Sequence, residues 1–281
     1  MHINDSDDLA PEHVERIADL LGVPEADHET FRHELQGEGH ADRHKGSDGK
    51  LAHKPLEFLY DRFTAYIEDR RIRPRADVMT ELATATFPDG TLPDVHDVML
   101  IAANLFAAGQ ETTARMLSTA LRLIGERPEL ESALRADTTL IPTFVEEIVR
   151  LESPIQGNFR LARRTTEIGG VPIPAGTTLM VMEGAANRDP LHFPDPSELH
   201  LDRDNGRQHV GFGFGIHSCA GAPLARAEGR VSLERILTRM SDIRIAESEH
   251  GPAGNRRFEY TPIFMLRGLE RLHLEFTPAG S

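Results

Sequence analysis

Cysteine, tryptophan and lysine are scarce in this sequence of 281 residues, which contains one cysteine, no tryptophan and only three lysines. The single cysteine, Cys219, excludes a disulfide within the chain and any zinc or iron–sulfur site built from several cysteines. A metal site that takes only one thiolate ligand is still allowed. Because a free cysteine suits a reducing compartment, we expect a cytoplasmic protein.

Long apolar runs and an excess of positive charge are also missing. No run reaches transmembrane length, and the chain starts with acidic residues where a secretory signal peptide would start with basic ones. The 45 acidic residues outnumber the 31 basic ones, giving a formal net charge of −14. This excess argues against nucleic acid or an anionic membrane as the main partner. We therefore expect a soluble globular protein.

The residues around Cys219 include four glycines, which free the backbone to take positive φ and to approach a flat or bulky ligand. Helix formers follow from Pro223, so Cys219 lies just ahead of a helix N-terminus, whose partial positive charge stabilises an anionic sulfur. A nucleotide-binding loop is excluded, because Gly211, Gly213 and Gly215 lack the G-x-G-x-x-G spacing. The remaining readings are a metal ligand, which the glycines favour, and an inert buried cysteine.

The longest predicted helix covers residues 91–125 and contains a glycine in its interior, Gly109. Such a glycine costs on the order of 1 kcal/mol against alanine, so it indicates either close approach of another group or a local break in the helix. A break could arise if the Thr112 hydroxyl bonds back to the carbonyl of Ala108. Glu111 and Thr112 then place an acid and an alcohol together, which are residue types that pass protons. A tolerated glycine beside a surface glutamate is the alternative.

The remaining pattern predicts a mainly α chain with a smaller β-rich part. Apolar residues recur at helical spacing over residues 11–21, 25–35, 55–73, 77–85, 129–134, 141–151 and 222–240. The polar stretch 36–51 predicts a surface loop. Beyond Pro154 we expect a hairpin and a strand over 166–182, a proline-rich meander over 186–196, and strands near Ile243 and over 272–276.

Three motifs resemble those of the haem-thiolate monooxygenases, the cytochrome P-450 superfamily, in its bacterial soluble type, and they follow the family's order along the chain. The first is the cysteine-ligand loop, Phe212-x-x-Gly215-x-x-x-Cys219-x-Gly221, with His209 before it and His217 within it. The second, residues 107–113, resembles the distal-helix motif. The third is Glu147-x-x-Arg150 with Arg203, which in the family forms a buried structural network. Leu199 and His200 depart from the family's usual Phe and Asp.

The resemblance implies a role for each matching residue. Cys219 would be the proximal ligand of haem b, and Glu111 and Thr112 would act in oxygen activation. Haem propionate or loop contacts are expected from Arg160, His217 and His209, with a structural role as the alternative for each histidine. Further cofactor contacts are expected from Phe212, Gly213, Gly221 and Ala108. The residues expected to face the substrate, with a place in the plain core as the alternative, are Phe106, Ala107, Ile155, Gln156, Ile263 and Phe264.

The resemblance also implies a fold and a reaction. We expect one haem-thiolate catalytic domain over residues 1–281, with a helical part over 1–153 and with β segments, meander, cysteine loop and proximal helix over 154–281. The leading part of the family fold is expected to be absent, which predicts weak haem binding. The implied activity inserts one atom of O2 into a small or medium apolar organic substrate, with electrons from a donor such as a ferredoxin and its reductase.

Two alternatives to this activity are open, and one surface feature bears on the electron donor. The chain could be a catalytically impaired fragment or accessory haem-binding protein, or a helical binding module in which Cys219 is idle.

The predicted proximal helix carries Arg226, Arg230 and Arg235 after the cysteine. They predict either an arginine patch that docks an acidic electron donor or ordinary charge on a helix surface.

Overall fold

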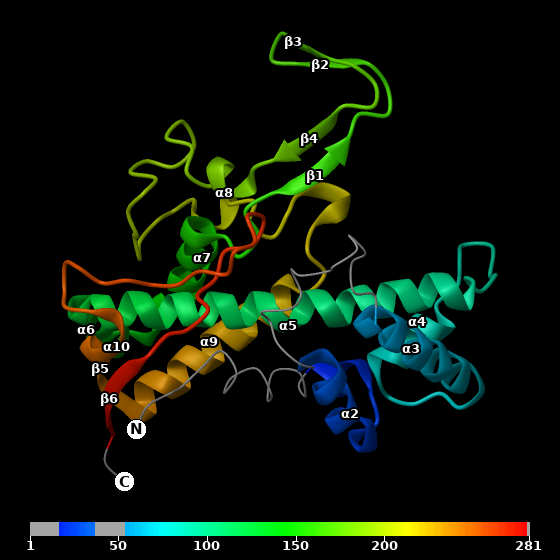
Figure 1. Cartoon of the computed structure of the whole chain (residues 1–281), viewed down its shortest axis with the longest axis horizontal. Helices are drawn as coiled ribbons and strands as arrows, with labels where there is room; N and C mark the ends of the chain where they lie inside the picture. Colours follow the sequence, from blue (N-terminus) through cyan, green and yellow to red (C-terminus); the bar gives the residue numbers. More distant parts are fainter. Residues whose placement is uncertain (1–16, 37–53, 280–281) are drawn as a thin grey trace. The chain divides into compact units, whose positions relative to one another are not determined.

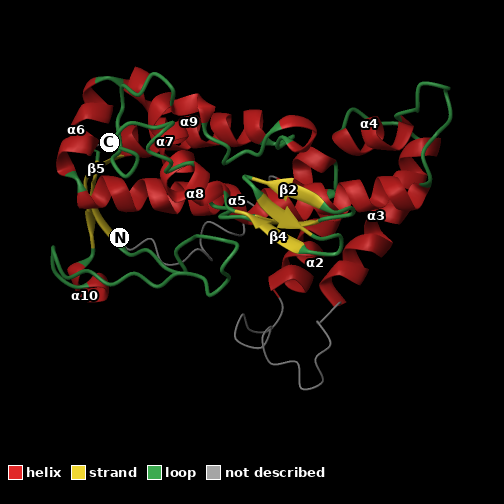
Figure 2. Cartoon of the chain, turned by 90° about the horizontal axis from the view of Figure 1, so that it is seen from above, coloured by secondary structure: helices red, strands yellow, loops and turns green. Residues whose placement is uncertain are grey.

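The computed structural model describes residues 17–36 and 54–279, and the chain forms two compact units. The described parts of the smaller unit are residues 17–36 and 54–111, and the larger unit is described over residues 112–279. Figure 1 colours the chain by sequence, and Figure 2 distinguishes helices from strands. Residues 11–16 of the first predicted helix, and residues 37–51 of the predicted polar loop, lie outside the described residues.

The smaller unit is helical, as the apolar spacing predicts. It contains a helical segment over 17–21, α2 (Glu25–Gln36), α3 (Lys54–Ile72), α4 (Val78–Thr84) and the first part of α5 (Val95–Glu126). Its core is aromatic: the ring of Phe106 lies 5.4 Å from that of Phe31 and 5.7 Å from that of Phe63. All three rings are fully buried, so they hold α2, α3 and α5 together by apolar packing.

A buried arginine joins the ends of helices in this unit. Arg70, at the end of α3, is only 1% exposed and donates to Asp77 Oδ2 at 2.8 Å and to the carbonyl of Gly22 at 2.7 Å. Asp77 is also the N-cap of α4, where its Oδ1 accepts the N–H of Thr80 at 2.8 Å. Burial raises the pKa of Asp77, but bonds from Thr80 and Arg70 outweigh it, and the net pKa lies below the ordinary value.

Helix α5 has 32 residues, so at about 1.5 Å per residue it is roughly 48 Å long. It begins at Val95, later than predicted, because Asp94 caps it by accepting the N–H of His96 at 2.8 Å. The helix is α-helical throughout, without a break at Gly109. A Cβ on Gly109 would lie 3.0 Å from Ile17 Cδ1, so close approach of a neighbouring side chain explains this glycine.

The larger unit packs helices around one apolar core. Its helices are the last part of α5, α6 (Pro128–Ala136), η1 (Thr138–Leu140), α7 (Ile141–Glu152), α8 (Glu183–Ala186), η2 (Gly206–Gln208), η3 (Gly215–His217), α9 (Ala222–Arg239) and α10 (Glu247–His250). Buried residues of α5, α7 and α9 meet in the core, among them Ile124, Phe144 and Leu233. Gly229 lets α9 approach, since a Cβ there would lie 2.8 Å from Met116.

The strands form three separate antiparallel pairs. β1 (Asn158–Leu161) pairs with β4 (Thr178–Val181), and β2 (Thr166–Ile168) pairs with β3 (Val171–Ile173) at the tip of the same excursion (Figure 1). β5 (Met240–Ile245) pairs with β6 (Leu274–Pro278). β1 is a strand that the sequence pattern did not predict. Every strand of the described chain follows residue 157, which confirms a mainly α fold with a smaller β-rich part.

Candidate active site

Cys219 lies at the end of a tight loop and has an exposed, free thiol. Its backbone N–H donates to the carbonyl of Phe212 at 2.7 Å, which closes the loop into a ring of eight residues. Its own carbonyl accepts the N–H of Ala222 at 3.3 Å, where α9 begins. The predicted position ahead of a helix N-terminus is therefore present, and the sulfur is open to a ligand.

Two glycines in this loop adopt backbone conformations that other residues disfavour. Gly213 has φ of +73° and Gly215 has φ of +69°, both in the left-handed region. A Cβ on Gly213 would lie only 2.9 Å from the carbonyl oxygen of His217, so a side chain there would push the loop open. These glycines let the chain turn sharply enough to present Cys219 at the surface.

A buried carboxylate that the sequence reasoning missed lies behind the loop. Glu146 of α7 accepts a bond from His209 Nε2 at 3.0 Å and two from Arg226, at 2.7 Å from Nε and 3.1 Å from Nη2. Burial raises the pKa of Glu146, but the bonds from His209 and Arg226 outweigh this effect and lower it to about 2. The only sequence signal was a second acid directly before the Glu147 motif.

These contacts show that the His209 side chain supports the cysteine loop. Its Nε2 meets Glu146, and its Nδ1 accepts the N–H of Gly211 at 3.1 Å. Both ring nitrogens are therefore engaged, which agrees with a loop contact and leaves no nitrogen for a haem propionate. His217, in contrast, is exposed at the end of η3, and its role toward haem stays a prediction.

The predicted arginine patch on α9 needs a correction. Arg226 is held by Glu146, and its guanidinium lies 4.5 Å from the centroid of the Phe212 ring. Arg230 donates to Glu234 at 2.8 Å, which offsets its charge. The arginines that line a cavity of about 290 Å³ beside Glu146 are Arg207, Arg226 and Arg230. Arg235 is exposed but is not among the residues lining it.

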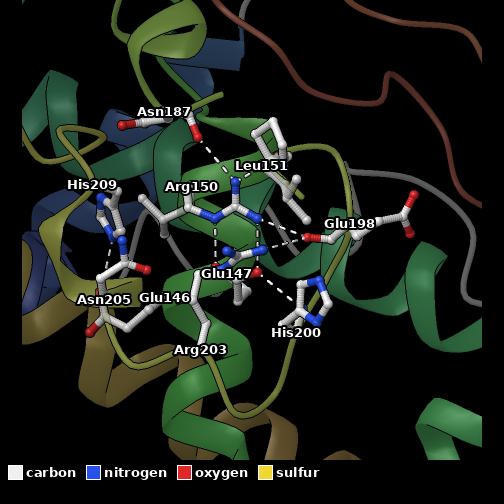
Figure 3. A network of polar contacts seen from close by, with 12 residues as sticks. Glu146, Glu147, Arg150, Leu151, Asn187, Glu198, His200, Arg203, Asn205 and His209 are labelled. Atoms are coloured by element: carbon white, nitrogen blue, oxygen red, sulfur yellow. Dashed lines mark hydrogen bonds and ion pairs between the residues drawn. The ribbon is translucent and has the colours of Figure 1, made fainter. Parts of the chain in front are cut away.

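The Glu147–Arg150–Arg203 network forms as predicted (Figure 3). Arg150 donates to both oxygens of Glu147, at 2.6 Å and 2.9 Å, and Arg203 Nε lies 3.0 Å from Glu147 Oε1. Glu147 and Arg150 are fully buried. Burial raises the pKa of Glu147, but hydrogen bonds from Arg150 and from the backbone of His200 outweigh it, so the net pKa lies below the ordinary value.

This network pins the meander between α8 and the cysteine loop. Arg150 donates to the backbone carbonyls of Asn187, Pro196 and Glu198 at 2.7 to 3.0 Å. Arg203 donates to the carbonyls of Pro194, Asp195 and Glu198. His200 joins through its backbone N–H, 3.1 Å from Glu147 Oε2, so its departure from the family pattern leaves the network intact.

The predicted oxygen-side residues occupy neighbouring positions on α5. Ala107, Ala108 and Glu111 are exposed, and Thr112 is half-buried. Phe106 is different: its fully buried ring packs against Phe31 and Phe63 in the aromatic core. The alternative of a plain core position therefore describes Phe106, and its assignment to the substrate pocket is not supported.

An apolar surface lies at and beside β1 and includes Ile155, Phe159, Ile263 and Phe264. The cation next to it is Arg160. Ile155 pairs with Leu266, which brings the turn that contains Ile263 and Phe264 alongside. The ring of Phe264, 69% exposed, lies 6.0 Å from that of Phe159. Phe159 was missed by the sequence reasoning, because β1 was not predicted. Its neighbour Arg160 is exposed and has no carboxylate partner among the described residues.

Gln156 lies next to this surface, but its side chain faces the protein. Its Nε2 donates to the carbonyls of Glu152 and Ser153 at 2.9 Å and 2.7 Å, where it caps the end of α7. Its Oε1 lies 2.5 Å from the place that a Cβ on Gly184 would take. These contacts give Gln156 a structural role in place of the predicted contact with substrate.

The residues around Cys219 suit a cofactor with one protein ligand. Within residues 17–36 and 54–279, no cluster of three or more His, Cys, Asp or Glu is arranged to hold a metal ion. One exposed thiol and the exposed cation of Arg160 match haem b, whose iron takes one axial thiolate and whose propionates need cations. In the same described ranges, no helix is both long enough and apolar enough to cross a membrane.

Comparison with known proteins decides the family. A family model described as Cytochrome P450 matches residues 49–242. This chain belongs to the cytochrome P450 family. Cytochrome P450 144 of Mycobacterium tuberculosis is 37% identical over 217 residues, which are 77% of this chain and 46% of that protein. The cytochrome P450 monooxygenase PikC of Streptomyces venezuelae is 31% identical over 261 residues, covering 92% of this chain and 60% of that protein.

Solved cytochrome P450 structures share the fold. The substrate-free structure of Mycobacterium marinum cytochrome P450 CYP150A6 is 53% identical with a TM-score of 0.87, covering 99% of this chain and 65% of that one. The chain thus spans between 46% and 60% of the length of the two curated relatives named above. The predicted superfamily and fold are confirmed, and haem b with a cysteine thiolate ligand is the cofactor of this family.

Proposed function

We propose that this chain carries the haem-thiolate centre of a monooxygenase, with Cys219 as the axial ligand. The observation that carries the proposal is the exposed thiol of Cys219. The backbone of this residue is hydrogen-bonded to the Phe212 carbonyl and to the first turn of α9. Haem, when bound through a thiolate, supplies the oxygen activation and O–O bond cleavage. Family membership supports the monooxygenase reaction class, and we propose that reaction for the whole protein.

The chain's own residues would divide the remaining tasks. The N-terminus of α9 and the Phe212 carbonyl would orient the backbone of Cys219, from which the sulfur projects. Arg160 would pair with a propionate, because its guanidinium is exposed and no described carboxylate neutralises it. Glu111 and Thr112 would move protons from solvent toward the oxygen-binding side, as an acid and an alcohol in sequence.

The substrate is proposed to be a small or medium apolar organic molecule. Support comes from the exposed rings of Phe159 and Phe264, 6.0 Å apart in an edge-to-face arrangement beside Ile155. Such a pair offers apolar area without a charged anchor. CYP109E1 from Bacillus megaterium, which is 27% identical, has been solved in complex with corticosterone and with testosterone. Those ligands belong to that protein, but their apolar character agrees with the proposed substrate class.

Electrons are proposed to come from an acidic donor such as a small ferredoxin with its reductase, in the cytoplasm. The cavity lined by Arg207, Arg226 and Arg230 supports this proposal, because Arg226 also touches Phe212 of the cysteine loop. Arg207 is 75% exposed at its side chain and can meet a carboxylate of the donor. The rate of association should then fall as salt rises.

The proposal is tested by titrating haem into the 281-residue chain and into two variants. Cys219→Ser removes the ligand, and Ser218→Ala is the matched control, because it changes the neighbouring hydroxyl and leaves the thiol. We expect the parent and the control to bind haem with a thiolate absorption spectrum and Cys219→Ser to lose that spectrum. A parent that binds haem with another ligand's spectrum would instead indicate an accessory haem-binding protein.

A further inference from the structure

Glu146 binds both sides of the cysteine loop, although it lies outside the Glu147 motif. Its side chain is 4% exposed and shares its two oxygens between His209, ten residues before Cys219, and Arg226, seven residues after it. Arg207 approaches the same carboxylate at 3.4 Å. One buried anion on α7 therefore joins the segment that leads into the loop, through His209 (Figure 3), to the helix that follows it, through Arg226.

On the leading side, the hydrogen bonds of His209 define the tautomer of its neutral ring. Its Nδ1 accepts the N–H of Gly211 at 3.1 Å, so in the neutral ring the proton is on Nε2, which donates to Glu146 at 3.0 Å. This chain of bonds runs from α7 through the imidazole to the backbone of the loop. It fixes the orientation of His209 in the way that a carboxylate orients a histidine in many sites.

On the following side, Arg226 connects the same carboxylate to Phe212. The guanidinium is bound by Glu146 at two points and lies over the Phe212 ring, 4.5 Å from its centroid. The carbonyl of Phe212 in turn accepts the N–H of Cys219 at 2.7 Å. A path of direct contacts therefore leads from Glu146 to the backbone of Cys219.

We propose that Glu146 is a positioning residue for Cys219, which it holds through His209 on one side and through Arg226 and Phe212 on the other. The part of this proposal that concerns haem rests on the proposed function, and the part that concerns the loop does not. The neighbouring Glu147 holds α7 to the meander, so Glu146 acts from a helix that is itself fixed. Without its charge, the buried His209 and the partly exposed guanidinium of Arg226 lose the carboxylate that accepts their hydrogen bonds.

The test compares Glu146→Gln with Glu152→Gln in the 281-residue chain. Glu152 is a matched control, because it also belongs to α7, is 14% exposed and pairs with arginines, Arg267 at 2.6 Å and Arg122 at 3.2 Å. Among the described residues, none of its hydrogen bonds or ion pairs reaches the loop. Amide hydrogen exchange at Cys219 and Gly211 is measured by NMR, with the β5–β6 amides as an internal reference. We expect Glu146→Gln to speed exchange at both loop amides by about tenfold or more and Glu152→Gln to leave them unchanged.

A second variant keeps the test decisive if Glu146→Gln does not fold. Arg226→Lys retains the positive charge but loses the two-point bond and the stacking on Phe212, so Cys219 exchange should rise while Gly211, held through His209, changes less. Unchanged exchange at Cys219 in the folded variants, or an equal rise in Glu152→Gln, would overturn the proposal.

Haem provides a separate readout. If the parent binds haem, Glu146→Gln should weaken haem affinity by about tenfold and shift the thiolate absorption band, while Glu152→Gln should retain both. If the parent binds no haem at all, the proposed function fails, and the amide exchange still decides whether Glu146 positions Cys219. The two failures can thus be told apart.

Discussion

The backbone carbonyl of Phe212 and the backbone N–H of Cys219 are joined by a hydrogen bond of 2.7 Å. This bond closes the loop, and the ring of the same Phe212 carries the guanidinium of Arg226. Phe212 therefore links the backbone of Cys219, through Arg226, to the buried carboxylate of Glu146.

Disrupting the Glu147–Arg150 pair should destabilise the fold strongly. Arg150→Ala leaves the carboxylate of Glu147 buried and removes bonds to three meander carbonyls. We expect the free energy of unfolding to fall by about 3–5 kcal/mol. Arg230→Ala removes an exposed pair with Glu234 and should cost under about 1 kcal/mol. Urea unfolding of both variants measures the difference, and equal losses would contradict the structural role of the network.

Acid should destabilise the protein through Glu146. Its folded pKa of about 2 lies below the ordinary value of 4.5, so its contribution is present above that ordinary value and is lost as pH falls toward 2. The full contribution is roughly 3 kcal/mol. Urea unfolding at a series of pH values should show a shallower acid dependence for Glu146→Gln than for the parent. An identical dependence in the two proteins would rule out this charge as a source of stability.

Features that depend on residues close together in the sequence were predicted well, and features that depend on contacts between distant residues were not. The loop around Cys219 and the Glu147–Arg150 pair are local patterns that appear where the sequence placed them, and α5 appears with its start four residues later than predicted. The resemblance supplied the distant partner Arg203. Glu146 and Phe159 were missed, because their roles arise from contacts with residues 80 and 105 positions away.

Two residues expected at the substrate or in the plain core, Phe106 and Gln156, face the protein for a common physical reason. Position in sequence does not define the direction of a side chain. The ring of Phe106 turns into an aromatic core, and the amide of Gln156 turns to the free carbonyls at the end of α7. For Arg226, the sequence allowed a docking patch or ordinary helix-surface charge and gave no sign of its buried partner, Glu146.

Arg160 should contribute to haem affinity, because it is a cation that no carboxylate of the described residues pairs with. Arg160→Ala is expected to weaken haem binding by about tenfold to a hundredfold, because a buried propionate would lose its charged partner. Arg163→Ala is the control, since Arg163 is an exposed arginine three residues along the same segment. Haem titration followed by absorption gives both affinities. Equal affinities for the two variants would remove Arg160 from the cofactor site.

Thr112 should affect the use of electrons in any turnover that this chain supports. Thr112→Ala removes the hydroxyl proposed to relay protons, so more electrons should leave as peroxide and fewer as product. Ser118→Ala provides a comparison on the same helix, since it removes a half-buried hydroxyl that bonds to the carbonyl of Ala114 at 2.9 Å. Peroxide and product are measured against consumed reductant. The relay assignment does not survive if Thr112→Ala couples as well as Ser118→Ala.

The most direct test of the central claim is the absorption of the haem-loaded, reduced protein after exposure to carbon monoxide. Ligation by Cys219 predicts the red-shifted band of a thiolate-bound haem in the parent and in Ser218→Ala, and its absence in Cys219→Ser with helix content retained by circular dichroism. The same red-shifted band in Cys219→Ser, or a histidine-type band in the parent, would contradict the account.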